Sequence, residues 1–590
     1  MARIVPCIIA LALTAVTATV AAPAAADHTD PREPLAPTEG FAEQGLPRGE
    51  GTWEHLANFR GLANPALTGG GTDMEFFSPA GTQDVWGSFG TLGQDEGGSI
   101  GQRIVRLTKD GEVTPTWVAD HGSAHCPPNN SSVTGLQHDT QIGKLGKISL
   151  MTDTTDAVGR CHDPGGGGIE IVDVSSVTEA EPLPREVHMV RFAGFTHTNT
   201  IDHRYDWIVY NSSSDFADRN WIDVMNMKSC FGKADWSLKK RRSACRPEVT
   251  RIQLKPKWTQ QRDSETGELE PGSATCHDIT FLKGRLYCAA LNATVILDVK
   301  DLVRPNGSVR GESFPCTVEP GTLTGAKVTD CSAMGAERTE RAKGWRFVGK
   351  VSHPGRDCGP PGSDVRNCNT NFNVSSDQGV AVAHEADPSH DQKFMFVTDE
   401  RGGGIVPPGA TCEPGLENPV GNGGAHAFDI SDPSNIEYAT TPSGEKAVYI
   451  SEAVVPAETF CDIHVMERVK GEQRFVVAYY TQGIKIVDYF VDDEGHLQFE
   501  EVASFTLPNT NVWAAESFKV QRNEDGTRTY FIAANDIHRG IDVVSWTGEP
   551  NPIGSPAPAR SETLSNSGLA GASFVVIAAA LLYRRRHRSS

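Results

Sequence analysis

The segment GIEIVDVSS, residues 168–176, is a short run of β-branched residues that ends in an aspartate and a turn. Related segments return along the chain with an aspartate in the same place: TVILDVKD at Asp298, AHAFDISDPSN at Asp429, GIKIVDYFVDD at Asp488, GIDVVSW at Asp542 and, more weakly, NWIDVMN at Asp223. Such runs between turn residues predict strands. The carboxylate can accept backbone N–H bonds in the turn, which gives the recurring aspartate a structural reason.

A second element lies upstream of each copy: LQHDTQI at His138, FTHTNTI at His197, TCHDITF at His277, VAHEAD at His384, CDIHV at His464, VWAAES at Glu516 and a divergent GTDMEFF at Asp73. Two further apolar runs complete the unit, one between these elements, such as RFVVAYYT, and one after the aspartate, such as EVHMVRFAG. Four strands in each of seven units predict an all-β fold, a seven-bladed β-propeller.

The two ends of the array predict how the ring closes. The last unit has three strands, and WEHLANFRG, residues 53–61, reads like a fourth strand without a unit of its own. An N-terminal strand that completes the last blade would join the ring and cover its edges. The alternative is that this segment forms an edge strand of the first blade.

The GIEIVDVS and AFDISDP segments, with a His-Asp start upstream, resemble the repeats of the bacterial LVIVD-repeat proteins. The resemblance covers roughly residues 53–546 and implies a secreted or surface β-propeller; it implies little about activity. The chain departs from the family pattern in three insertions rich in Cys, Gly and Pro, at 315–331, 356–378 and 402–424.

Composition excludes several classes of protein. The chain has 590 residues, 38% of them hydrophobic, with 59 glycines and 36 prolines, which is too turn-rich for a helical bundle. Its formal charge of −21 argues against a nucleic-acid partner, because binding to phosphates needs a basic surface.

The two ends predict an extracellular protein with a membrane anchor. Residues 1–26 combine Arg3, an apolar stretch and small residues, which is typical of a signal peptide cleaved after Ala26. Residues 564–583 carry no charge and predict a single transmembrane helix, and the arginines of 584–590 predict a cytoplasmic tail. A linker at 27–52, the propeller at 53–547 and a Pro/Ser-rich linker at 548–563 complete the expected division. The C-terminal end is similar to Gram-positive sorting signals, but it lacks an LPxTG-type motif.

All cysteines but Cys7 fall in the expected extracellular body, and none has zinc-binding spacing. Disulfides are therefore expected. Pairs closing short loops are candidates: Cys230/Cys245, Cys316/Cys331 and Cys358/Cys368.

Histidines occupy the same upstream element in five units: His138, His197, His277, His384 and His464. Because the innermost strands of a propeller line its channel, we expect these imidazoles to converge and to bind a transition metal, Cu, Zn or Fe. The adjacent Asp139, Asp278 and Glu385 are expected to orient the rings.

A structural role is left open beside the metal site. Repeated His/Asp pairs can simply hydrogen-bond strands together inside each blade, and five copies exceed what one metal needs. Blades one and seven carry acids instead, Asp73, Glu75 and Glu516, which favours a site.

Two functions follow from these observations. The first is a membrane-anchored extracellular binding or scaffold protein with a metal in its channel, whose partner is an unidentified cell-surface protein or small ligand. The alternative is an extracellular metal-dependent oxidase or hydrolase that uses the channel histidines. No GxSxG, HExxH or Walker motif is present, so the sequence assigns no catalytic residue.

Overall fold

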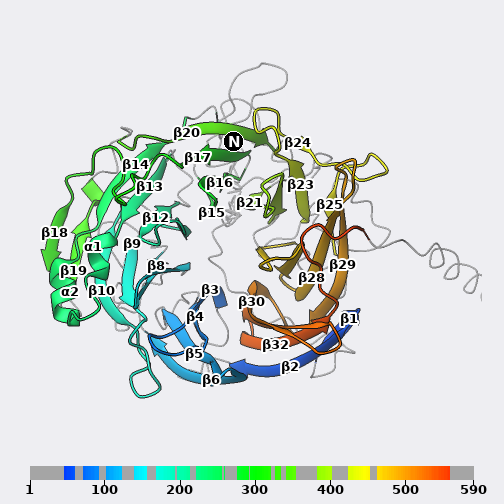
Figure 1. The fold of residues 1–590 in the computed structure, drawn as a ribbon, viewed down its shortest axis with the longest axis horizontal. Coiled ribbons are helices and arrows are strands. Elements are labelled where there is room, and N and C mark those ends of the chain that lie inside the picture. The colour runs from blue at the N-terminus through cyan, green and yellow to red at the C-terminus, as the bar shows by residue number, and fades with distance from the viewer. Residues whose placement is uncertain are drawn as a thin grey trace, which may run out of the picture.

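The computed structural model arranges seven β-sheets in a ring (Figure 1). It describes residues 45–59, 71–91, 101–121, 139–155, 168–192, 196–212, 221–255, 258, 276–291, 293–320, 326–333, 341–353, 380, 382–400, 423–451 and 462–557. The seven-bladed, all-β propeller is confirmed.

Each blade has four antiparallel strand positions in chain order from the centre outward. Two short strands share the outer position of blade 5, and an N-terminal strand takes that of blade 7. Blade 1 contains β3 (Gly71–Phe77), β4 (Trp86–Thr91), β5 (Gln102–Lys109) and β6 (Glu112–His121). Blade 2 contains β7 (Thr140–Leu145), β8 (Ile148–Thr155), β9 (Gly168–Asp173) and β10 (Arg185–Arg191). Blade 3 contains β11 (Asn199–Ile201), β12 (Ile208–Asn211), β13 (Trp221–Asn226) and β14 (Glu248–Gln253).

The remaining blades repeat this order. Blade 4 contains β15 (Asp278–Leu282), β16 (Arg285–Ala289), β17 (Ala293–Asp298) and β20 (Arg346–Ser352). Blade 5 contains β21 (Ala383–Pro388), β22 (Phe394–Asp399), β23 (Ala425–Asp429) and the short strands β24 (Glu437–Tyr438) and β25 (Val448–Tyr449). Blade 6 contains β26 (Met466–Arg468), β27 (Arg474–Ala478), β28 (Ile484–Val491) and β29 (Leu497–Thr506).

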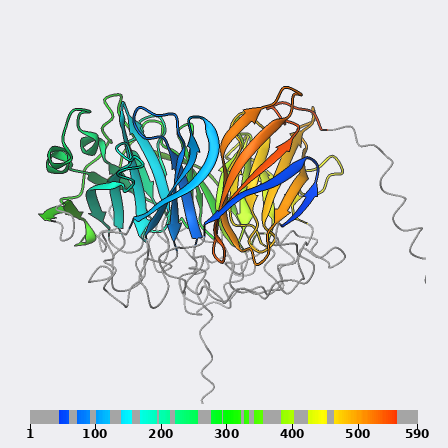
Figure 2. The same ribbon diagram turned by 90° about the horizontal axis from the view of Figure 1, so that it is seen from below.

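The N-terminus closes the ring, as the orphan strand in the sequence predicts. Blade 7 takes β30 (Val512–Arg522), β31 (Arg528–Asp536) and β32 (Gly540–Gly548) from the C-terminal end and β2 (Thr52–Phe59) from the N-terminal end. β2 pairs antiparallel with β32, and Figure 2 shows the blue strand beside the orange ones. The alternative, in which this segment joins the first blade, is wrong.

A second N-terminal strand binds the neighbouring blade. β1 (Leu46–Gly49) pairs antiparallel with β29 at the outer edge of blade 6. The turn at Gly49 and Gly51 has positive φ at both glycines, where added Cβ atoms would meet backbone oxygens at 2.2 Å. The two short strands therefore hold blades 6 and 7 together from outside.

An unexpected strap joins blades 2, 3 and 4 on the outside. The chain between β17 and β20 forms the hairpin β18 (Thr317–Pro320) and β19 (Lys327–Asp330), and β19 pairs parallel with β10 of blade 2. On its way it bonds to blade 3, where the Phe314 N–H donates to the Val249 carbonyl over 2.8 Å. The sequence marked 315–331 as an insertion without predicting this pairing.

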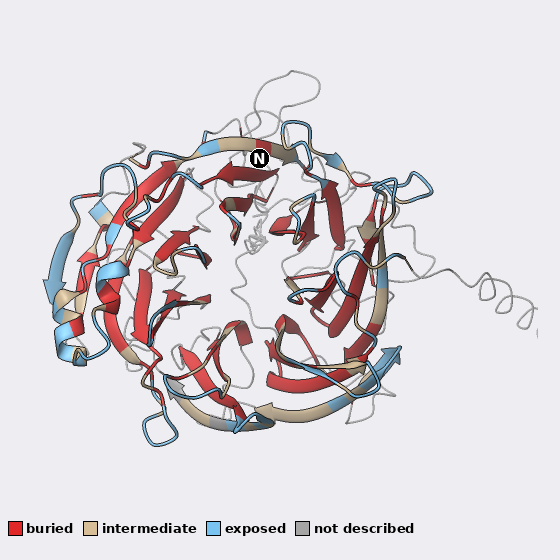
Figure 3. Cartoon of the chain, in the orientation of Figure 1, coloured by how far each residue is buried: buried red, intermediate tan, exposed pale blue. Residues whose placement is uncertain are grey.

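The core lies between the blades, which is why the inner strands are buried on both faces (Figure 3). A cluster of buried apolar side chains fills each of the seven interfaces between neighbouring blades. The cluster between blades 7 and 1, for example, packs Ile541 and Val543 against Phe89 and Val105. Seven filled interfaces make the ring one continuous body.

Two of the expected disulfides are present, Cys230–Cys245 and Cys316–Cys331. The first links the helices α1 (Lys228–Phe231) and α2 (Leu238–Ala244), and the second closes the β18–β19 hairpin. A third pair, Cys276–Cys288, was not among the expected ones. Cys358 and Cys368 lie outside the described residues.

The recurring aspartates act in the turns as expected in three copies: Asp173 accepts from the Ser175 N–H, Asp298 from that of Lys300 and Asp429 from that of Ser431. In Asp223, Asp488 and Asp542 the carboxylate instead pairs with an arginine of the same blade.

The expected signal peptide (1–26) and transmembrane helix (564–583) lie outside the described residues. Within the residues that the structure describes, none of the helices is long and apolar enough to cross a membrane.

Candidate functional site

Four histidines from four consecutive blades come together on the innermost strands. His197, His277 and His464 lie just ahead of β11, β15 and β26, and His384 lies within β21. All four side chains are almost completely buried.

In blades 3, 4 and 6 the second strand holds the backbone of the histidine. The histidine N–H donates to a carbonyl at the end of that strand, over 3.3 Å from His197 to Ser212, 2.6 Å from His277 to Ala289 and 3.0 Å from His464 to Ala478. At His277 the Cys276–Cys288 disulfide also ties the preceding residue to β16. The imidazoles therefore project from fixed backbone, as a preorganised site requires.

The four rings form a continuous row. Ring centroids are 4.3 Å apart between His197 and His277, 4.8 Å between His277 and His384, and 4.1 Å between His384 and His464. The Nε2 atoms of His197 and His277 are 3.3 Å apart. The expected convergence is real for these four residues.

Glu400 places a carboxylate beside the row. It directly follows β22, the second strand of blade 5, and is fully buried. Its Oε2 atom lies 3.6 Å from His384 Nε2, and its Oε1 atom lies 3.5 Å from His464 Nε2. Burial raises the pKa of Glu400 well above its usual value, although the hydrogen bond from Tyr480 opposes this.

Two aromatic side chains complete the surroundings. The Tyr480 hydroxyl donates to Glu400 Oε1, and the Trp513 ring lies 4.5 Å from that of His464. Tyr480 has a φ of 34°, which is strained for a bulky residue, and its carbonyl accepts from the Val512 N–H of blade 7 over 3.0 Å. The contact between blades 6 and 7 thus holds the phenol on the carboxylate.

One subset of these residues has the spacing of a metal centre. One ligand atom each from His277, His384 and Glu400 lies within 4.8 Å of the others, and all three residues are buried. Two imidazoles and a carboxylate form a donor set suited to zinc, iron or copper. The chemistry of the residues therefore fits the expected metal.

Seven carboxylates occupy the innermost strands or the residues just ahead of them; Asp139 and Glu385 are buried and the other five are half-buried. Asp278 and Glu385 directly follow a histidine, Glu467 lies three residues beyond His464, and the other members come from three more blades: Asp73, Glu75, Asp139 and Glu516. Desolvation raises the pKa of each, and repulsion from neighbouring carboxylates adds to this for all of them except Asp278. The pKa of Glu75 reaches about 7.

Several of these carboxylates link neighbouring blades. Asp73 accepts from the Thr140 N–H over 3.0 Å, Asp139 accepts from the Asn199 amide over 2.8 Å, and Glu385 accepts from the Met466 N–H over 2.8 Å. For Asp139 and Glu385 the hydrogen bonds thus run between blades, whereas the sequence led us to expect that they orient imidazoles. These bonds join neighbouring blades, which differs from the structural role left open above, where a His/Asp pair joins strands inside one blade.

The structure assembles His197, His277, His384 and His464, while His138 lies outside the described residues. Sequence reasoning missed Glu400, Tyr480 and Trp513. The signal for Glu400 is the acidic pair that ends the run KFMFVTDE, and the signal for Tyr480 is the tyrosine pair in RFVVAYYT.

No protein-family model matches the chain, and no curated protein matches it in sequence. Solved structures with a similar fold include the periplasmic gluconolactonase PpgL of Pseudomonas aeruginosa, at 11% identity and a TM-score of 0.38 over 80% of this chain and 97% of that one. Sqt1 of Saccharomyces cerevisiae is similar at 9% identity and a TM-score of 0.33, over 84% of this chain and 98% of that one. The likeness concerns the fold alone.

Proposed function

We propose that the protein binds a transition-metal ion in its central channel through His277, His384 and Glu400. The observation that carries the proposal is the mutual spacing of their ligand atoms, within 4.8 Å, in three buried side chains. His464, whose Nε2 lies 3.5 Å from Glu400, supplies a fourth donor, and His197 adjoins His277.

The donor set favours zinc, copper or iron over calcium or magnesium. Calcium and magnesium prefer oxygen ligands, whereas imidazole suits the transition metals. A bound metal of this kind supplies Lewis-acid or redox chemistry. The chain holds the ligands, and the buried Tyr480 and Trp513 limit water beside them.

The function that this geometry supports best is an extracellular metal-dependent oxidase or hydrolase. The strained Tyr480 favours a functional site over a purely structural one, because such backbone conformations concentrate at functional sites. Its hydroxyl fixes the orientation of Glu400.

A surface binding or scaffold role is the second candidate. The ring is closed by the pairing of β1 and β2 with blades 6 and 7, and the β18–β19 hairpin joins blade 4 to blade 2. Such a ring offers a rigid platform. A metal in the channel would then be structural.

We also propose an extracellular location with an anchor at 564–583, in keeping with the resemblance to LVIVD-repeat proteins. Three disulfides among the described residues support an oxidising compartment.

Metal analysis of the purified protein tests the central proposal. After reconstitution with zinc, copper or iron and gel filtration, we expect about one equivalent of one metal. His277→Ala and His384→Ala should each remove it. His390→Gln is the matched control, because it changes a half-buried imidazole at the other end of the β21–β22 hairpin. Less than about a tenth of an equivalent in the parent protein would contradict the proposal.

Activity separates the two candidates. An enzyme should show oxygen uptake or hydrolysis of ester or phosphate substrates that a chelator abolishes and the metal restores. A scaffold should capture its partner equally well in the presence of the chelator.

A further inference from the structure

A cavity lies at the outer rim of the ring, between blades 6 and 7. Its volume is about 570 Å³, within the range of small-molecule sites. It is built where the turn between β1 and β2 meets β29, the β30–β31 turn and the chain after β32. The channel histidines, in contrast, lie at the inner ends of the sheets.

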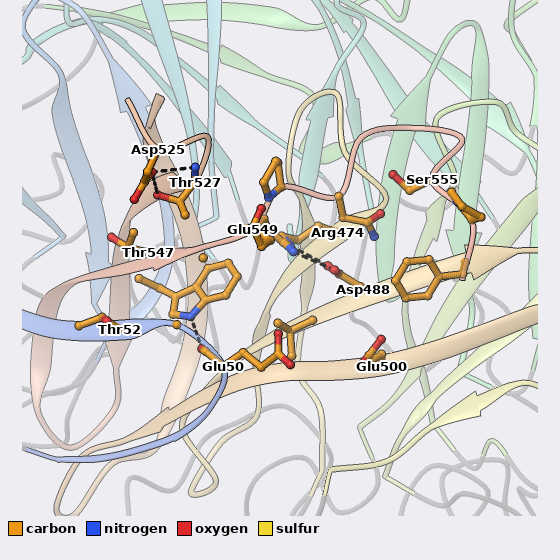
Figure 4. A pocket seen from close by; sticks show the side chains of 18 residues that line it. Glu50, Thr52, Arg474, Asp488, Glu500, Asp525, Thr527, Thr547, Glu549 and Ser555 are labelled. Atoms are coloured by element: carbon orange, nitrogen blue, oxygen red, sulfur yellow. Dashed lines mark hydrogen bonds and ion pairs between the residues drawn. The ribbon is translucent and has the colours of Figure 1, made fainter. Parts of the chain in front are cut away.

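The lining is strongly acidic. Glu50, Glu500, Asp525 and Glu549 present exposed carboxylates, and Asp488 adds a buried one; Figure 4 shows them around Arg474. The residues that line the cavity include one cation, the buried Arg474.

Arg474 cannot recruit an anion. Its guanidinium donates to both carboxylate oxygens of Asp488, over 2.6 and 2.8 Å, and also to the Tyr530 hydroxyl and the Glu549 carbonyl. The charge that remains for a ligand is therefore negative, which favours a cationic one.

A buried acceptor on Asn551 points to the same ligand chemistry. Asn551 lines the cavity and is 4% exposed. Its N–H donates to Glu472 and its Nδ2 donates to the Gln473 carbonyl, which fixes the amide. The remaining atom, Oδ1, is a buried acceptor with no donor among the described residues. A ligand that carries N–H donors would satisfy it.

The ligand has to be an organic cation, because the lining does not fit a metal ion. Among the described residues, the groups whose carboxylate and imidazole ligand atoms lie within 4.8 Å of one another do not include these acids. The apolar side chains of Phe490, Val502, Pro550 and Pro556 line the same cavity. Such a lining suits an alkyl chain that ends in a charged group.

We propose that this rim cavity binds the ammonium group of an alkylamine, either a free small amine or the lysine side chain of a partner. The carboxylates of Glu500 and Glu549 attract the charge, Asn551 Oδ1 accepts one of its hydrogen bonds, and Phe490 contacts the alkyl chain.

Calorimetric titration of the purified full-length chain tests this. The probes are 1,5-diaminopentane, N-acetyl-lysine amide and, as the neutral counterpart, 1,5-pentanediol. We expect at least one of the two ammonium probes to bind, more weakly at high salt, and the diol not to bind. Binding of the diamine alone indicates a free amine, and binding of the lysine derivative indicates a partner side chain.

The double substitution Glu500→Gln/Glu549→Gln should weaken binding at least about tenfold, because it removes two charged acceptors from exposed positions without changing their shape. Asp493→Asn, an exposed acid of the same blade outside the cavity, should leave the affinity unchanged. The proposal fails if neither ammonium probe binds, if the diol binds equally well, or if the double variant retains full affinity.

Discussion

Glu400 is the residue on which the metal proposal depends most. It is the one carboxylate in the candidate centre, and it touches both His384 and His464. Glu400→Gln keeps the shape and the hydrogen bond from Tyr480 but removes the negative charge. We expect metal affinity to fall at least about tenfold in competition with a chromophoric chelator.

Two further variants separate the metal role of Glu400 from its packing. Tyr480→Phe leaves the carboxylate but frees its orientation, so we expect a loss of about 10- to 100-fold. Glu445→Gln changes an exposed carboxylate on blade 5 and should have no effect. Equal affinity in Glu400→Gln and the parent would show that another residue binds the metal.

His353 predicts how acid acts on the fold. It directly follows β20 and is fully buried, with its Nε2 atom 2.8 Å from Thr294 Oγ1. Burial lowers the pKa of His353 to about 3. The unfolded chain takes up a proton near pH 6.5 and the folded one does not, so stability is complete above pH 6.5 and falls as the pH drops toward 3. At pH 5 this group alone costs about 2 kcal/mol.

Urea unfolding at pH 7.5 and pH 5 measures this cost. In His353→Gln the difference in unfolding free energy between the two pH values should shrink by about 2 kcal/mol. Phe428→Leu, which alters the ring that packs on His353 without changing a titratable group, should lower stability equally at both pH values. An unchanged pH difference in His353→Gln would refute the assignment.

At the residue scale, repetition decides what the sequence can predict. His197, His277, His384 and His464 recur in one register, so a search for repeats finds them. Glu400, Tyr480 and Trp513 each occupy a repeat position that other blades fill differently. A search for residues that the blades share cannot detect these three. They contribute to the candidate site because they differ from their counterparts in the other blades.

At the scale of elements, the β18–β19 strap shows what periodicity misses. Its strands have no repeated pattern, and β19 pairs with a blade two positions back in the ring. The blade strands were predictable because β-branched runs recur between turns. The parallel pairing was not, because it depends on contacts that form only once blades 2 and 3 stand side by side.

The Cys316–Cys331 disulfide should hold this strap in place. It closes a loop of 15 residues, which corresponds to about 3 kcal/mol in the chain-entropy model. In Cys316→Ser/Cys331→Ser we expect faster hydrogen exchange at Lys327–Asp330 and retained protection in β13. Cys230→Ser/Cys245→Ser serves as the control, since it should loosen α1 and α2 and leave β19 protected. Unchanged exchange in β19 would mean that pairing with β10 suffices.

At the scale of the whole molecule, stability depends on closure between the two ends of the chain. Asp542 on β32 is the centre of this contact. It accepts hydrogen bonds from Asn58 of β2 and from Arg539, and it pairs with His55 of β2 over 2.8 Å. Burial acts to raise the pKa of Asp542, but the hydrogen bonds from His55 and Arg539 outweigh it and hold the pKa below its usual value.

Asp542→Asn should therefore weaken the closed ring. The change removes the carboxylate that is hydrogen-bonded to the buried Arg539 guanidinium, which costs about 3 kcal/mol or more. A group with a lowered folded pKa stabilises above its unfolded pKa, near 3.9, and loses that contribution as the pH falls through the folded value. The deficit of the variant should thus be full at pH 7 and shrink below about pH 4. Thermal unfolding across this range measures the deficit, with proteolysis near residue 60 reporting release of β2.

Asp429→Asn is the control, because it changes an exposed aspartate at the same repeat position. It should change stability by less than about 0.5 kcal/mol. If both variants behave alike, the repeat aspartate supports only its own turn, and the ring is closed by the β2–β32 backbone pairing alone.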